Sequence, residues 1–410
     1  MTDRANKPVR FYLKAFAIGL CLFAYLLLGL YTEFRLIGIK PLPEKLIEDS
    51  NYYIRAFRDT EKGDDPYAVW DIGVGFLYPP PALLVVGALV RTTDLCQEYL
   101  GIDRVMLRAA LLTITNVLFL ALTIYGVARK YGYTLSDVWW WFPLGLGFAP
   151  FLEVLHVGQI NVITQFGVFL MFALAESAPM VGGLGLALSI VTKVTPLAFV
   201  GYLLASRNLR GILGGLIGLV ILSLLAGLAF GWQPFVAYVD IFRRLLDSFP
   251  LGANSQSLVA VLQSHGLLVD SRVPTAHRIL TIYLLLVFAA SAAIAYVSRQ
   301  REPLFIVLSL GLALMPNVMW YHHYVFFLLP VFVWLAWSRQ HPAVVVWCCL
   351  GLALIQIDRQ YSILQVSHGA LAHGFGHASI LAILAWQVRL GCGILRGKPG
   401  LSELLGWRQV

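Results

Sequence analysis

Carboxylates that could serve as a general base are concentrated in one polar stretch of this apolar chain, residues 31–103. A carboxylate there can accept a proton from an attacking hydroxyl group. Asp49 precedes a helix-like run that contains Tyr52 and Tyr53. An alternative interpretation is that Asp49 is the N-cap of that helix, accepting hydrogen bonds from its first amides. Four other acids in the same stretch compete for the role: Asp59, Asp64, Asp65 and Asp71.

Two further charged residues lie within apolar segments, where charge is costly and usually faces a polar cavity. Glu153 precedes a Gly158-Gln159-Ile160-Asn161 sequence near the end of a predicted span. It either faces such a cavity or reaches the membrane surface without a function. Lys193 has apolar neighbours on both sides, and Pro196 frees backbone carbonyls nearby. Its ammonium either neutralises a lipid phosphate or satisfies those carbonyls.

Histidines form the other candidate group. His322 and His323 lie in a Trp320-Tyr321-His322-His323-Tyr324 sequence, which is also typical of an aromatic belt at a membrane surface. Adjacent residues on a helix point about 100° apart, so both imidazoles do not readily bind one metal ion. We expect one to face a cavity and the other to pack. Three more are interpreted as residues of the last outer loop: His368, His373 and His377.

No metal or cofactor site follows from the pattern of ligand-type residues. The five cysteines include no C-x-x-C spacing and no paired loop cysteines, which indicates neither a disulfide framework nor a cysteine-based metal site. Aspartate, glutamate and histidine residues form no convincing ligand spacing either. We therefore predict that the protein uses no metal and no cofactor.

The composition shows what must position these residues. Of 410 residues, 59% are hydrophobic and only 13% charged, more apolar surface than a soluble core can use. Apolar runs long enough to cross a bilayer recur along the chain, so we predict one all-α polytopic membrane domain, residues 1–410. The formal charge of +8 arises from bases in short loops, a pattern that sets membrane orientation and does not indicate nucleic acid.

The predicted topology depends on the segment from Tyr78 to Arg91. It is about fourteen residues long, too short for a bilayer of about 30 Å, so we place it along the membrane surface. Residues 182–205 are broken at Lys193 to Pro196 and are interpreted as two half-helices that enter and leave on the cytoplasmic side. The predicted spans are 11–30, 104–128, 138–155, 158–175, 211–231, 279–297, 303–319, 324–337, 344–357 and 378–395.

Loop charges support this arrangement. The first apolar run follows several bases and no cleavage site of small residues follows it, so it is interpreted as a retained span with a cytoplasmic N-terminus. Two large loops, 31–103 and 232–278, then face outward. The predicted cytoplasmic bases are Arg129, Lys130, Arg207, Arg210, Arg299, Arg301, Arg339, Arg396 and Lys398. The polar clusters share the outer face, which indicates one extracytoplasmic site: Asp49, Tyr78, Glu153 to Asn161, Asn254 to Ser257 and Trp320 to Tyr324.

The order of motifs resembles glycosyltransferase family 87, membrane enzymes of the GT-C class that use polyprenyl-phosphate sugars. Mycobacterial phosphatidylinositol-mannoside mannosyltransferases and related arabinofuranosyltransferases belong to that family. The matching motifs cover about residues 49–330: Asp49 with Tyr52-Tyr53-x-x-Ala56, Pro66-Tyr67, Tyr78-Pro79-Pro80, Gly158-Gln159-x-Asn161, Lys193-x-x-Pro196, Gln256-Ser257-Leu258 and Trp320-x-His322-His323.

The resemblance implies a GT-C fold with about 11–13 transmembrane helices, a catalytic aspartate at Asp49 and a surface helix that begins at Tyr78. The family's Asn-Gln-Ser motif appears here as Asn254-Ser255-Gln256-Ser257, and the last eighty or so residues match no motif. On this basis Asp49 and His322 are assigned to catalysis. The residues assigned to substrate binding are Tyr52, Tyr78, Gln159, Asn161, Lys193, Gln256 and His323.

The implied reaction moves a hexose such as mannose, or a pentofuranose, to a lipid or glycan acceptor at the cell membrane. The leaving phosphate has a second pKa of about 6, so one carboxylate base suffices and no general acid is required. The main alternative is a secondary transporter or flippase, favoured by helix breaks at Lys193 to Pro196 and at Pro316. We find no internal repeat of the kind that many transporters have. A scaffold without activity is the third alternative.

Overall fold

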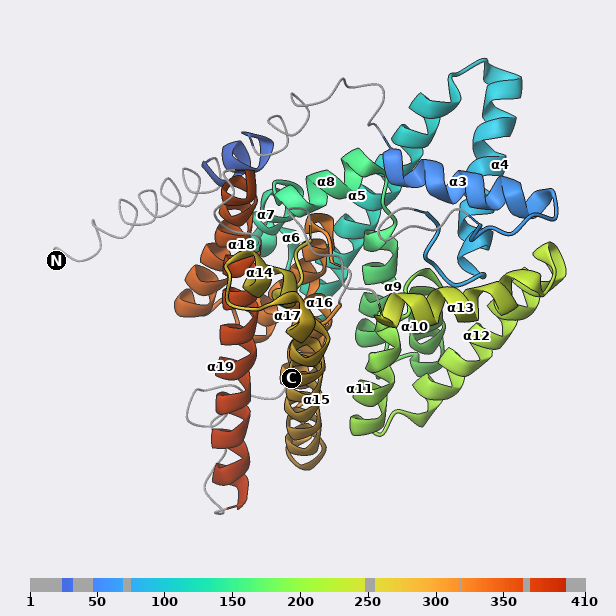
Figure 1. The fold of residues 1–410 in the computed structure, drawn as a ribbon. Helices are drawn as coiled ribbons and strands as arrows, with labels where there is room; N and C mark the ends of the chain where they lie inside the picture. Colours follow the sequence, from blue (N-terminus) through green and yellow to red (C-terminus); the bar gives the residue numbers. More distant parts are fainter. Residues whose placement is uncertain are drawn as a thin grey trace.

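The structure is a computed structural model that describes residues 24–31, 47–68, 75–247, 255–316, 319–363 and 369–395, with the side chains of 358–363 and 390–395 left out. Within these ranges every regular element is a helix (Figure 1). Four are long and apolar enough to cross a bilayer: α5 (Arg104–Lys130), α12 (Leu209–Phe230), α15 (Val273–Ser298) and α19 (Ala370–Leu395). The chain is an all-α polytopic membrane protein.

Shorter apolar helices complete the bundle. They are α9 (Asn161–Ala173), α10 (Pro179–Thr192), η1 (Thr195–Ala198), α11 (Phe199–Ala205), α16 (Glu302–Leu314), η3 (Tyr321–Phe327), α17 (Leu328–Trp337) and α18 (Pro342–Ile363). The remaining elements are α3 (Glu48–Glu61), α4 (Ala82–Leu100), α6 (Leu135–Val138), α7 (Trp141–Leu146), α8 (Ala149–Val157), α13 (Gln233–Asp247), α14 (Leu258–Ser264) and η2 (Asp270–Arg272). In Figure 1, α3 and α13 lie across the direction of α15 and α19.

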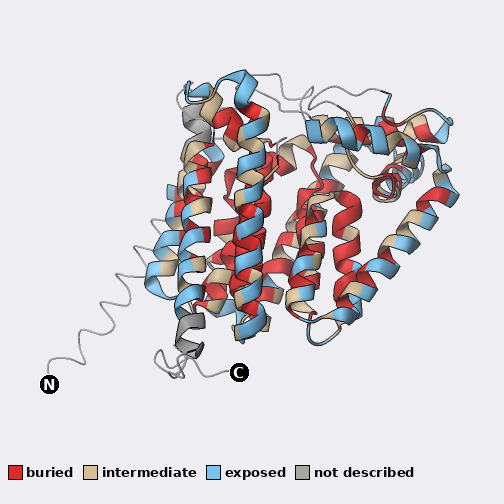
Figure 2. Cartoon of the chain, turned by 60° about the horizontal axis from the view of Figure 1, so that its bottom comes forward, coloured by how far each residue is buried: buried red, intermediate tan, exposed pale blue. Residues whose placement is uncertain are grey.

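Helix α5 shows why these segments cross a membrane. Residues 109–128 carry no charge and would be about 30 Å long as a helix, which matches the hydrocarbon thickness. One face is exposed through Ile114, Leu118 and Leu122, spaced four residues apart. The opposite face is buried, and it includes Asn116. The apolar face therefore suits lipid, whereas the buried face holds a polar residue for the protein interior (Figure 2 shows the same division on other helices).

Close helix packing connects α10 to its neighbours. A side chain at Gly183 would collide with the backbone of Gly211 and Gly215 in α12, so glycine permits this approach. Gly218 in turn lies against Ala187, one turn further along both helices, so α10 and α12 run parallel. Two parallel helices that follow one another in sequence need a returning segment between them, which η1 and α11 provide.

The predicted break in residues 182–205 is confirmed. Lys193 ends α10 with extended backbone angles, φ −163° and ψ 130°, and Pro196 lies in η1 just after it. The Asn208 side chain, beyond the end of α11, donates a hydrogen bond of 2.8 Å to the Ala175 carbonyl, near the start of α10. The two half-helices therefore enter and leave at the same end of the bundle, with Lys193 at the turn.

Two sequence predictions about helices are wrong. Residues 138–155 do not form one span, because the chain breaks into α6, α7 and α8 in a segment that contains Pro143, Gly147 and Pro150. The helix predicted to end near Arg91 continues to Leu100 as α4. Three charged residues interrupt α4, namely Arg91, Asp94 and Glu98, whereas the charges of α5 lie only near its ends.

Loops that were predicted to share one side of the membrane meet at one end of the structure. Arg301 pairs with Glu176 at 3.2 Å, and the Trp140 indole donates to the Gln340 amide oxygen at 3.3 Å. The ammonium of Lys130 lies 5.1 Å from the centroid of the Phe172 ring. The apolar core between these loops and the opposite end is built around α16, η3 and α17.

Candidate active site

Asp49 lies in the first turn of α3. The N-cap of this helix is Ile47, with a left-handed φ of 62°, so the interpretation of Asp49 as the cap is wrong. Its carboxylate instead accepts a hydrogen bond from the side-chain amide of Gln159, 110 residues away in sequence. The start of a helix also favours negative charge, because its free amides point toward the carboxylate.

The orientation of Gln159 follows from two tyrosines. Its amide oxygen accepts hydrogen bonds from the Tyr53 hydroxyl at 2.7 Å and the Tyr78 hydroxyl at 3.0 Å, and the two hydroxyls are 2.9 Å apart. Burial raises the pKa of both phenols well above the usual value, so they stay protonated and act as donors. Because the amide oxygen faces hydroxyl donors, the amide nitrogen must face Asp49.

The local backbone explains how these residues meet. Gly158 ends α8 with a φ of +72°, and a side chain there would lie only 3.0 Å from the Ile47 Cβ and 3.1 Å from the Ser50 Cβ. The Ile47 amide donates a hydrogen bond of 2.8 Å to the His156 carbonyl. The start of α3 is thereby attached to the end of α8. Asn116 of α5 donates to the Gln159 carbonyl at 3.1 Å and holds the same loop from the other side.

The electrostatics of this group favour a proton acceptor. Burial raises the pKa of Asp49 from 3.8 to about 6, with Glu48 adding a smaller increase and the hydrogen bond from Gln159 opposing it. At pH 7 the ionised form of Asp49 still outnumbers the protonated form by about ten to one. It is also a stronger base than an ordinary aspartate, which is the property that general-base catalysis requires.

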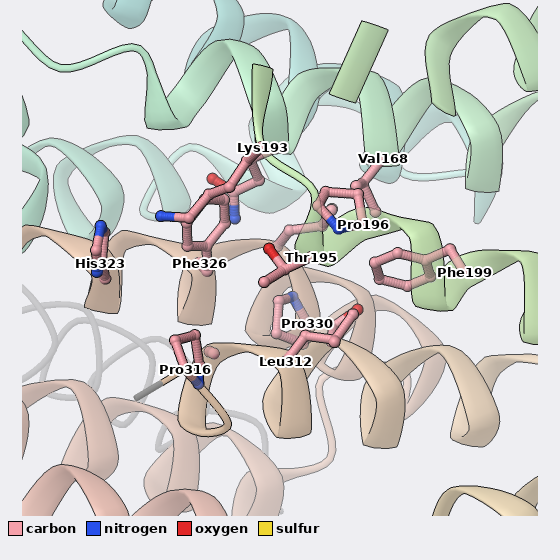
Figure 3. Close-up of a pocket in the computed structure, with 14 residues that line it drawn as sticks. Val168, Lys193, Thr195, Pro196, Phe199, Leu312, Pro316, His323, Phe326 and Pro330 are labelled. Atoms are coloured by element: carbon pink, nitrogen blue, oxygen red, sulfur yellow. The ribbon is translucent and has the colours of Figure 1, made fainter. Parts of the chain in front are cut away.

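A second group surrounds Lys193 at the turn between α10 and η1. Its ammonium lies 5.1 Å from the Phe326 ring centroid, and Figure 3 shows the side chain extending over that ring on the side where His323 lies. These residues line a cavity of about 40 Å³, with room for roughly three water molecules. His323 Nδ1 accepts a hydrogen bond from the Trp320 amide at 3.1 Å. In the neutral ring the proton is therefore on Nε2.

The two groups are neighbours along α9. Gln165 lines the cavity beside Lys193 and donates a hydrogen bond of 3.3 Å to the Val325 carbonyl of η3. It lies in α9, six residues after Gln159, which precedes the start of this helix. The two groups therefore lie on the same part of the bundle, and α8 packs against both α3 and η3.

Gln256 belongs to a third group. Its backbone amide donates a hydrogen bond of 2.7 Å to the Met319 carbonyl, and its backbone carbonyl lies 2.8 Å from His373 Nε2. The Tyr324 hydroxyl donates to the same carbonyl at 3.3 Å. The interpretation of His373 and His377 as loop residues is wrong, because both lie in α19, and His373 is buried. His368 lies outside the described residues.

The other predicted site residues are placed as follows. Tyr52 is half-buried near Asp49, and its hydroxyl forms no hydrogen bond with the described part of the chain. Asn161 is fully buried at the start of α9, and neither atom of its amide is bonded to a described residue. His322 is buried, with its ring 4.6 Å from that of His323. Both histidines lie in a 3-10 helix, whose tighter winding was not foreseen.

Sequence reasoning missed two residues of the first group. Tyr53 belongs to a predicted motif but has no predicted role, although its spacing of four residues from Asp49 places both on one face of α3. Asn116 was overlooked, although a polar amide at membrane depth is itself a signal. The residues that the structure describes contain no group of three or more histidine, cysteine, aspartate or glutamate side chains arranged to hold a metal ion. Independence of metal stays a prediction.

The comparisons with known proteins agree with the resemblance seen in the motifs. One curated relative is 29% identical over 222 residues, covering 52% of this chain and 50% of its own length. It is the polyprenol-phosphate-mannose-dependent alpha-(1-2)-phosphatidylinositol mannoside mannosyltransferase of Mycobacterium tuberculosis (strain ATCC 25618 / H37Rv). The sequence model of glycosyltransferase family 87 matches residues 76–319, which include Tyr78, Gln159 and Lys193. Since this match covers more than half of the chain, the protein belongs to glycosyltransferase family 87.

Proposed function

We propose that this protein transfers a sugar from a polyprenyl-phosphate donor to a hydroxyl group of a lipid or glycan acceptor, with inversion. The observation that carries the proposal is the half-buried Asp49 carboxylate, held by an oriented Gln159 amide, together with a separate cavity that is lined by Lys193 and His323. Family membership supports the reaction class. The end of the bundle opposite Lys130 and Arg301 is proposed to face the extracytoplasmic side, since bases favour the cytoplasm.

Asp49 acts as the base in this scheme. The acceptor oxygen forms a bond to the anomeric carbon while the bond from that carbon to the phosphate oxygen breaks. The proton of the acceptor hydroxyl passes to Asp49, and the bonding electrons leave with the phosphate. This leaving group is stable as an anion, since its second pKa is about 6, so the reaction requires no proton donor on that side.

The donor phosphate is proposed to bind at the Lys193 cavity, beside Lys193 and His323. The ammonium of Lys193 and the Nε2 proton of His323 are suited to stabilise the negative charge that develops there, and His322 is held beside His323. Gln159 and Gln165 are six residues apart, so the proposed base and the proposed phosphate site belong to neighbouring parts of the bundle.

The donor sugar is proposed to be a hexose, with mannose favoured by the name of the relative, which also specifies a phosphatidylinositol mannoside acceptor for that protein. Tyr52 and Asn161 are proposed to orient the sugar, because one lies beside Asp49 and the other has a buried amide that no described residue satisfies. Gln256 is also proposed to bind substrate, because its side-chain nitrogen is buried and no described residue satisfies it. A pentofuranose donor is the alternative within the same family.

Replacement of Asp49 by asparagine tests the proposal. The purified protein is reconstituted with labelled polyprenyl-phosphate mannose and membrane lipid acceptors, and the rate of label transfer is measured. We expect Asp49→Asn to lose about 10²- to 10⁴-fold in rate while still binding the donor. The matched control is Asp59→Asn on the same helix, where the carboxylate only pairs with Arg55 at 3.6 Å. A fully active Asp49→Asn protein would exclude this base.

A transporter is the second candidate, favoured by one observation. The turn at Lys193 between two half-helices is a feature that transporters use to build binding sites. Sealed vesicles loaded with labelled lipid-linked sugar separate the two functions. A transporter moves the label across the bilayer unchanged, whereas a transferase forms a new glycosidic bond and releases polyprenyl phosphate.

A further inference from the structure

The ammonium of Lys193 has few contacts that fix its position. It lies 5.1 Å from the Phe326 ring centroid. It makes no hydrogen bond or ion pair with the part of the chain that the structure describes. The place of the ammonium therefore depends on the backbone from which the side chain starts and on the side of the cavity that carries Phe326.

The backbone leaves α10 at Lys193. The Lys193 amide still donates a hydrogen bond of 2.8 Å to the Ser189 carbonyl, but the residue itself has extended angles. Helix ends fray more readily than helix interiors. The last turn of α10 therefore needs support from outside the helix if the lysine is to stay in one place.

Thr164 of α9 provides this support. Its hydroxyl oxygen lies 2.9 Å from that of Thr192, the residue immediately before Lys193, and both threonines are fully buried. Thr192 donates its own hydroxyl proton to the Leu188 carbonyl at 2.9 Å. Because a hydroxyl group has only one proton, the proton between the two threonines comes from Thr164. The end of α10 is thereby bonded to α9.

Thr164 is itself fixed against α10. Its carbonyl accepts a hydrogen bond of 2.7 Å from the Ser189 hydroxyl. A side chain at Gly167 would lie only 2.3 Å from that hydroxyl oxygen and 2.4 Å from the Gly185 carbonyl oxygen. Glycine therefore lets the backbones of α9 and α10 approach closely, which leaves Thr164 little freedom to move away from α10.

The next residue of α9 fixes the other side of the cavity. Gln165 lines the cavity and donates a hydrogen bond of 3.3 Å to the Val325 carbonyl of η3. The same short helix carries His323 and Phe326. Lys193 extends over the Phe326 ring on the side where His323 lies (Figure 3). Two consecutive residues of α9 therefore hold the lysine side and the histidine side of the cavity relative to one another.

We propose that Thr164 is a positioning residue for sugar transfer: through Thr192 it keeps the Lys193 ammonium where the departing donor phosphate needs it. Thr164 contacts no substrate in this scheme and acts through Lys193 alone. The inference rests on the proposed function, which places the donor phosphate at this cavity. A misplacement of about 1 Å can cost about a hundredfold in rate, so one buried hydrogen bond is enough to affect catalysis.

Replacement of Thr164 by valine tests the proposal in the transfer assay with labelled polyprenyl-phosphate mannose. Valine has nearly the shape of threonine but no hydroxyl group. We expect Thr164→Val to lower kcat about tenfold and to change donor affinity less than about twofold, whereas Thr164→Ser should keep kcat within about twofold. The matched control is Thr93→Val in α4, which should keep full kcat. Thr93 is equally buried, but its hydroxyl donates within its own helix, to the Val90 carbonyl at 2.8 Å.

A double substitution separates positioning from a structural role. Lys193→Gln removes the ammonium, so adding Thr164→Val to it should lower kcat by less than about twofold. A structural role would instead lower kcat about tenfold in both backgrounds, and that result would overturn the inference. A Thr164→Val protein with full kcat would overturn it as well.

Hydrogen–deuterium exchange checks the geometry without any reaction. The Lys193 amide should exchange about tenfold faster in Thr164→Val than in the unaltered protein, because the end of α10 has lost its support. Unchanged exchange would contradict the positioning role and leave the proposed function intact. An unaltered protein that transfers no sugar would overturn the proposed function and this inference together.

Discussion

Replacement of Gln159 by leucine should move the acidic limb of the activity profile to higher pH. Leucine has a similar size but cannot donate to the Asp49 carboxylate, and this hydrogen bond favours the charged form. Without the donor, burial and Glu48 still raise the pKa of Asp49, and the opposing influence is gone. The carboxyl group then stays protonated over a wider range of pH, and a protonated carboxyl cannot act as the base.

The size of the shift follows from the strength of the lost bond. A hydrogen bond to a charged group is worth about 1.5–3 kcal/mol, or about one to two pKa units. Starting from a pKa of about 6, Asp49 in the leucine variant should therefore titrate at about 7–8. At pH 7 the ionised fraction would fall from about nine-tenths to between one-half and one-tenth. Activity at pH 7 would fall by the same factor and recover above about pH 9.

The assay is the initial rate of sugar transfer at low donor concentration in nanodiscs, measured from about pH 5 to about pH 10. Tyr78→Phe is the matched control, because it removes one hydroxyl but leaves Tyr53 to orient the Gln159 amide. Its acidic limb should stay near pH 6. A Gln159→Leu enzyme whose acidic limb stays at the original pH, or moves to lower pH, would refute the assignment of that limb to Asp49.

Three further predictions concern positioning and charge. Gly158→Ala should lower the stability of the purified protein by about 1–3 kcal/mol in thermal unfolding, since alanine resists a φ of +72° and would press on Ile47. The control is Gly201→Ala, because a side chain at that position meets no atom within 4 Å. Lys193→Gln should lower kcat about a hundredfold with little change in donor affinity, as steady-state kinetics with a donor-binding assay would show. His373→Ala should destabilise the protein by about 1–2 kcal/mol in chemical denaturation, because the Gln256 carbonyl loses a buried donor.

Part of the molecule follows from local patterns in the sequence. Hydropathy predicts an all-α membrane protein, because lipid leaves backbone amides and carbonyls no partner outside a helix. The break at Lys193 is readable because Pro196 lies beside a charged residue that apolar segments rarely contain. The break in residues 138–155 was missed although Pro143 and Pro150 are visible, because prolines near helix starts are tolerated and periodicity alone does not locate such starts.

The first residue group shows where local patterns stop. A helix beginning near Asp49 is predictable, but an N-cap and a first-turn carboxylate look alike in a sequence, and boundaries shift by a residue or two. The structure decides between them because Gln159 reaches Asp49 from across the fold. In the same way, His373 gains its role only because α19 brings it to Gln256, 117 residues away.

The sequence by itself determined the membrane class, the family and the set of polar residues from which a site can be built, since these depend on residue types and on their order. The tertiary structure alone decided that Gln159, oriented by Tyr53 and Tyr78, holds Asp49 and that Gln165 bonds η3 beside the Lys193 cavity. The reason is physical: hydrogen bonds between side chains depend on distances of a few ångströms between segments far apart in the chain. Helical periodicity reports only which face of its own helix each residue occupies.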